Sequence, residues 1–97
     1  MISSWGFIYL GPGSDPATNR VVLNHDGLET TLVAVPTPEG AAQVAVGLVE
    51  GGVQLIELCG ALGPTIAAKV IEATGGRVPV GVVAFGVESI GRLAALV

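Results

Sequence analysis

Ionic side chains are scarce in this sequence, and their scarcity limits how much of the protein surface can be exposed to water. Only 12% of the 97 residues are charged and 51% are hydrophobic, whereas soluble domains average about 25% charged residues. A short chain has proportionally more surface to cover with polar groups. We therefore expect one face of the protein to be buried against another copy, in a homodimer or a larger assembly.

Cysteine, histidine and basic residues are also few, which excludes several classes of protein. The single cysteine, Cys59, permits no internal disulfide and fits a reducing cytoplasm. The single histidine, His25, has no other metal-ligating side chains at a suitable spacing in the sequence, so we expect no metal and no cofactor. Four basic against eight acidic residues give a net charge of −4, which disfavours a nucleic-acid partner.

The hydrophobic residues do not form a membrane segment. Uncharged stretches at 1–14, 58–68 and 78–87 are interrupted by glycine and proline, and all fall short of the roughly 20 residues that span a bilayer. No basic side chain precedes the apolar N-terminal segment, so we expect no signal peptide and a cytoplasmic location.

Local patterns predict one α/β domain, residues 1–97. Strand-forming residues and turn signals predict strands at 5–10, 20–24, 29–35, 53–58 and 78–85. The pair Asp26-Gly27 favours a tight turn that joins the second and third strands as a hairpin. Helices are expected at 38–50, where Thr37 caps the free N–H groups, from Gly63-Pro64 to Gly75-Gly76, and at 87–96.

The order of these elements predicts a small mixed sheet that is mostly parallel, built from an N-terminal strand, a hairpin and two crossover units. Crossovers between parallel strands are right-handed, so two that step the same way place both helices mainly on one face. The other face then lacks a helical cover, although the strand at 78–85 offers apolar residues to both sides. The strand order itself stays open.

Three stretches of the chain carry a resemblance to a known family. They are Gln-Leu-Ile-Glu-Leu-Cys-Gly-Ala-Leu-Gly-Pro at 54–64, Ala-Ala-Lys-Val-Ile-Glu-Ala at 67–73, and Val-Pro-Val-Gly-Val-Val-Ala-Phe-Gly-Val-Glu-Ser at 78–89. In these stretches the chain resembles a family of short bacterial proteins with no assigned function. The resemblance implies a free-standing cytoplasmic domain and brings no reaction, cofactor or catalytic residue with it.

Chemistry-bearing residues follow the predicted parallel strands, at the sheet edge where ligands bind in such folds. Glu57 is the best candidate, because burial inside an apolar strand raises a carboxyl pKa and suits it to acid–base work. Glu88 is a possible second carboxylate, and Cys59 a nucleophile only if a base lies nearby. The ligand-binding candidates are Gly60 and Gly63, whose loop N–H groups can cradle an anion, together with Thr37 and Ser89.

Each of these residues also has a structural interpretation. Glu57 can bond a loop N–H or an arginine of a neighbouring subunit, Cys59 can be an inert buried side chain, and Glu88 and Ser89 are ordinary first-turn residues. Two functions therefore remain open. One is an enzyme or binding protein for a small polar or anionic metabolite. The other is a non-catalytic module that associates with itself through its apolar sheet face.

Overall fold

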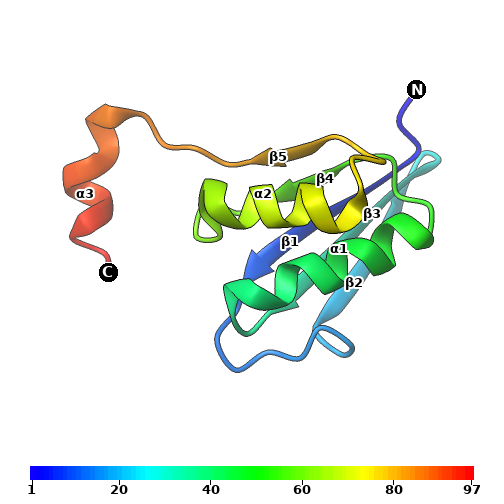
Figure 1. The fold of residues 1–97 in the computed structure, drawn as a ribbon, viewed down its shortest axis with the longest axis horizontal. Coiled ribbons are helices and arrows are strands. Elements are labelled where there is room, and N and C mark those ends of the chain that lie inside the picture. Colours follow the sequence, from blue (N-terminus) through cyan, green and yellow to red (C-terminus); the bar gives the residue numbers. More distant parts are fainter.

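The computed structural model describes all residues 1–97 and has an α/β fold with one five-stranded sheet (Figure 1). The strands are β1 (Ser4–Leu10), β2 (Arg20–His25), β3 (Leu28–Val35), β4 (Ile56–Leu58) and β5 (Val80–Val82). The α-helices are α1 (Ala41–Glu50), α2 (Gly63–Thr74) and α3 (Ile90–Ala94), and two 3₁₀ turns, η1 (Pro38–Gly40) and η2 (Val87–Ser89), precede α1 and α3.

The sheet is mixed and mostly parallel, with the strand order β2-β3-β1-β4-β5. The N-terminal strand β1 is central and runs parallel to both β3 and β4, and β5 continues the parallel set. Only β2 and β3 are antiparallel, joined by a turn in which Asp26 and Gly27 both have positive φ. That conformation matches the twist of a two-residue hairpin, so the hairpin predicted from this pair is confirmed.

Both long helices lie on the same face of the sheet, as the crossover argument predicts (Figure 1). The core between the layers includes Ile8, Val33, Ile56, Leu58 and Val70, none of which is exposed. Helix α1 approaches β1 closely at Gly6, where an added Cβ would lie 2.9 Å from Leu48 Cδ1. A glycine at this position is therefore what lets the helix sit directly over the central strand.

Several local expectations are corrected by the structure. Thr37 does not cap the first helix, since its side chain makes no capping hydrogen bond and the chain passes through η1 before α1 begins. Of the strand expected at 53–58, only Ile56–Leu58 is a regular strand. Because β5 pairs with nothing but this short strand, only Val80–Val82 of the segment 78–85 is a strand. That strand is partly exposed rather than buried, as it forms the edge of the sheet.

No helix covers the opposite face of the sheet, which we call the open sheet face. Strand alternation places every second residue there, and the register aligns these residues across neighbouring strands. The apolar side chains of the open sheet face are Trp5, Phe7, Tyr9, Val21, Leu23, Leu28, Leu32 and Leu55. Phe7 and Tyr9 stack with their ring centroids 6.3 Å apart. A surface of this kind is typical of a protein interface.

Candidate functional site

Glu57 lies on the open sheet face in the middle of β4, where it is aligned with Phe7 of β1 and Gly81 of β5. Together with Ile2, Trp5, Leu28 and Leu55, it lines a shallow hollow of about 280 Å³. The carboxylate is exposed, not half-buried as the apolar strand predicts. The reason is that the face it occupies has no covering layer within the chain, so water reaches it and the desolvation argument for an acid–base role is lost.

Cys59 follows β4 and is partly buried, with its Sγ accepting a hydrogen bond from the Leu10 N–H at 3.3 Å. A nucleophilic thiolate needs a neighbouring base or cation. The single histidine, His25, lies on β2, and both β3 and β1 separate that strand from β4. His25 is therefore not placed beside Cys59, and the thiol is partly buried against the end of β1.

The remaining sequence candidates are not brought together. Gly60 and Gly63 flank the short loop into α2, and Gly63 has a φ of +73° that favours glycine. Thr37 is exposed after β3. Glu88 and Ser89 belong to η2, which Figure 1 shows in orange beyond the sheet, at the N-terminal end of α3 and away from β4, the strand of Glu57. A carboxylate pair of Glu57 and Glu88 is not present within one chain.

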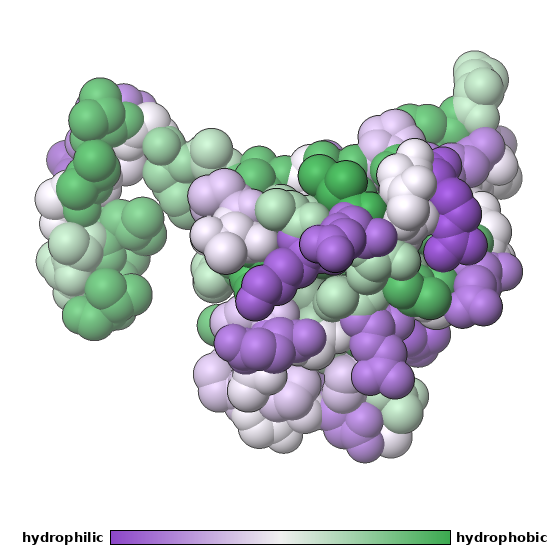
Figure 2. Space-filling model, viewed as in Figure 1, coloured by the Kyte–Doolittle hydropathy of each residue, from purple (hydrophilic) through white to green (hydrophobic).

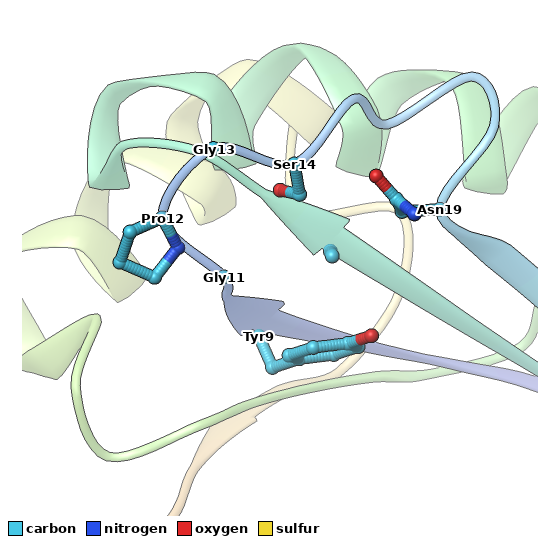
Figure 3. A pocket seen from close by; sticks show the side chains of 7 residues that line it. Tyr9, Gly11, Pro12, Gly13, Ser14 and Asn19 are labelled. Carbon is cyan, nitrogen blue, oxygen red and sulfur yellow. The ribbon is translucent and has the colours of Figure 1, made fainter.

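A different hollow lies where parallel strands β1 and β3 end, at the sheet edge favoured by ligands. It measures about 320 Å³, and Figure 3 shows the side chains of Ser14 and Asn19 facing the Tyr9 ring across it. Ser14 Oγ is buried and has no hydrogen-bond partner, whereas Asn19 Oδ1 accepts the Asp15 N–H at 2.8 Å. None of the lining residues is charged.

Sequence reasoning did not find this hollow. The loop that forms it, 11–19, reads only as a turn-rich connection of glycine, proline and small polar residues. What makes the hollow is the pairing of β1 with β3, which are far apart in sequence and adjacent in the sheet. The buried hydroxyl of Ser14 is visible only in three dimensions.

The model of a protein family of unknown function, DUF6506, matches residues 3–97. The chain belongs to this family. No curated protein and no solved structure matches it significantly. No group of three or more His, Cys, Asp or Glu side chains gathers in a way that could hold a metal ion. None of the helices has the length and apolar run that crossing a bilayer requires.

Proposed function

We propose that this member of DUF6506 is a self-associating, non-catalytic module of the bacterial cytoplasm whose open sheet face packs against the same face of a second copy. One feature of the fold supports this assignment above all: an apolar sheet face that no element of the chain covers. Its exposed members include Tyr9, Val21 and Leu23, with 37%, 50% and 40% of their surfaces in water. A sheet needs a cover on its apolar face.

A second copy fits this face because the face is nearly free of charge. Glu57 is its only acidic residue, and its partners in the neighbouring strands are the uncharged Phe7 and Gly81. A two-fold pair of such faces buries the same surface twice, which is the common route to a homodimer. The scarcity of charged residues, 12% of the chain, supports the same arrangement.

Two neighbouring valines make the proposal testable with a matched control. Val21 and Val22 are 50% and 49% exposed and stand side by side on β2, but Val21 belongs to the open sheet face and Val22 to the helix side. We expect Val21→Lys to weaken self-association and Val22→Lys to leave it unchanged. Sedimentation velocity at micromolar concentration measures both, against 9.7 kDa for one chain. Equal behaviour of the two variants contradicts the proposal, as does a monomeric natural protein.

The hollow at Ser14 supports a second function, the binding of a small neutral polar ligand where β1 and β3 end. A buried hydroxyl without a partner is uncommon in folded proteins, and a ligand group is one way to satisfy it. The absence of charged lining residues favours a neutral ligand over an anion. Chemical-shift changes of the Ser14 and Asn19 amides, followed by NMR against a set of small polyols and amides, test this; their absence with every compound contradicts it.

A further inference from the structure

The last fifteen residues, 83–97, form what we call the C-terminal arm, and it has little contact with the rest of its own chain. Its last backbone hydrogen bond to the sheet is donated by the Val83 N–H to the Leu58 carbonyl, at 2.9 Å. Beyond that point the chain runs out from β5 and ends in α3, which stands apart from the other helices (Figure 1). Every residue of the arm except Ser89 is exposed.

The arm is apolar although it is exposed. Figure 2 shows hydrophobic residues over most of α3 and a deep gap between this helix and the body of the protein. The arm has a single acidic and a single basic residue, Glu88 and Arg92. Its exposed large apolar side chains, with 39% to 103% of their surfaces in water, are Val83, Phe85, Val87, Ile90, Leu93, Leu96 and Val97.

One side of α3 faces the gap, and the gap is a defined hollow of about 610 Å³. Ile90, Leu93, Ala94 and Val97, spaced as one face of a helix, line it from the arm. Phe85 and the loop Cys59–Ala61 line it from the other side, so that seven of its eight lining residues are hydrophobic. Phe85 approaches the loop closely, because a Cβ added at Gly60 would lie 3.3 Å from its ring.

A helix as short as α3 does not persist without a packing partner. It has five residues, and isolated helices shorter than about 12–15 residues are marginal in water. Its own chain offers it only η2 as a neighbour with extensive contact. The apolar stripe of α3 therefore needs a surface from elsewhere.

We propose that two copies exchange arms, so that α3 of each copy takes the place of α3 in the other and packs its apolar stripe against that copy's Cys59–Ala61 loop. The area that the arms can bury fits a small dimer contact. Burial of an aliphatic or aromatic side chain is worth ~1.5–3 kcal/mol at ~25 cal/mol per Å², or about 60–120 Å² each. These seven side chains are already partly covered, with 39% to 103% of their surfaces in water. Over two arms they therefore give roughly 550–1,100 Å², which reaches the roughly 1,000 Å² that a biological interface needs.

The exchange specifies a contact for the self-association proposed above and does not depend on the open sheet face. A second α3 matches the hollow in chemistry, since its stripe is the same as the stripe that it replaces. In a two-fold arrangement each hollow receives one helix, and no apolar side chain of the stripe is left in water. The arm residue Arg92 lies on the side of α3 away from the stripe, where its charge stays in solvent.

The only cysteine of the chain allows a direct test, because Cys59 lines the hollow. The natural chain is mixed and refolded with a tagged chain that carries Cys59→Ser and Ala94→Cys, so that each chain has one thiol. Mild oxidation can then join the two chains only if Ala94 of one copy lies within about 7 Å of Cys59 of another. The control chain carries Cys59→Ser and Ala95→Cys, one residue further and about 100° around the helix.

Arm exchange predicts a reducible mixed dimer of natural and tagged chain, formed at least five-fold more efficiently with the thiol at 94 than at 95. Equal yields, or no mixed dimer, overturn the exchange. A chain with both Cys59 and Ala94→Cys that forms an internal disulfide as a monomer overturns it as well. The open sheet face is judged separately. For this purpose Val21→Lys is added to both chains. If the arm contact stands alone, the mixed dimer still forms. If the mixed dimer is lost, the arm contact exists only as part of the sheet-face dimer, and the claim that the arm contact is independent is overturned.

Discussion

Replacing Phe7 by alanine separates association from folding, because this ring lies on the central strand of the open sheet face. The register places it between Leu32 of β3 and Glu57 of β4. Its neighbour Ile8 points to the opposite side and is fully buried under the helices. The same truncation at two consecutive residues therefore probes two different layers of the protein.

The size of the effect at Phe7 follows from how much of the ring is still in contact with water. Full burial of such a side chain is worth about 1.5–3 kcal/mol. The ring is already partly buried within one chain, so that roughly a third of this value, about 0.5–1 kcal/mol, is left for a partner to contribute. A two-fold interface contains the ring twice. We thus expect Phe7→Ala to weaken dimerisation by about 1–2 kcal/mol, or roughly 5- to 30-fold in the dissociation constant.

The control, Ile8→Ala, should lower the free energy of unfolding by about 2–5 kcal/mol, the cost of truncating a fully buried aliphatic side chain. Its effect on the dissociation constant should be small. Sedimentation equilibrium over a hundred-fold concentration range gives the first quantity and urea unfolding at fixed concentration the second. A dissociation constant that is the same for Phe7→Ala and the natural protein would refute the placement of the open sheet face in the interface.

Three further substitutions test other parts of the structure. Gly6→Ala should destabilise the fold by about 1–3 kcal/mol because the added methyl group meets Leu48. Gly47→Ala, which has open space around it in α1, should stabilise the fold by up to about 1 kcal/mol. Urea unfolding that ranks the two variants in the opposite order contradicts the close packing of α1 on β1. Ser14→Ala removes a buried, unpartnered hydroxyl and should raise the melting temperature or leave it unchanged, while a loss of about 1 kcal/mol or more would show that Ser14 has a partner in the folded chain. Glu57→Leu removes the one acidic group of the open sheet face. It should tighten dimerisation, measured by dilution, at least about ten-fold, because an unpaired buried carboxylate costs several kcal/mol. Weaker association would mean that Glu57 is paired across the interface.

Features set by neighbouring residues in the chain could be predicted from the sequence. The Asp26-Gly27 turn has the positive φ values that its residue types favour. Helix α2 begins at Gly63-Pro64 and ends before Gly75-Gly76, the residues that mark it in the sequence. The two helices share one face because both crossovers are right-handed and, in the strand order of this sheet, step the same way. Each of these features depends on a few consecutive residues or on a rule of chain geometry.

Features set by distant pairing could not be predicted. Nothing in the sequence 4–10 indicates that β1 is the central strand, since its partners β3 and β4 lie far along the chain. The prediction for Glu57 is wrong for the same reason. Its two apolar neighbours in the chain predict that the side chain is buried, yet the open sheet face on which it lies is uncovered. The hollow at Ser14 depends on the β1–β3 pairing as well.

The apolar run at 78–85 shows why the sequence predicts a buried strand over these residues. A nearly continuous apolar run is equally typical of a strand covered by its own chain and of a segment covered by another. The structure pairs three residues of it, packs Val78 partly against the core, and leaves the end of the run, 83–85, exposed. Periodicity reports that a side chain will be buried and does not report which chain buries it.

The low burial of the single chain links its stability to its assembly. Only 17 of the 97 residues are buried, and the largest apolar surfaces that remain, the open sheet face and the arm, are the two proposed contacts. Partners that bind the folded chain and not the unfolded one stabilise it by mass action. If association covers these surfaces, the midpoint of thermal unfolding must rise with protein concentration. A midpoint that is the same at 1 and 100 μM would mean that the chain folds fully by itself, and both contacts would lose their physical basis.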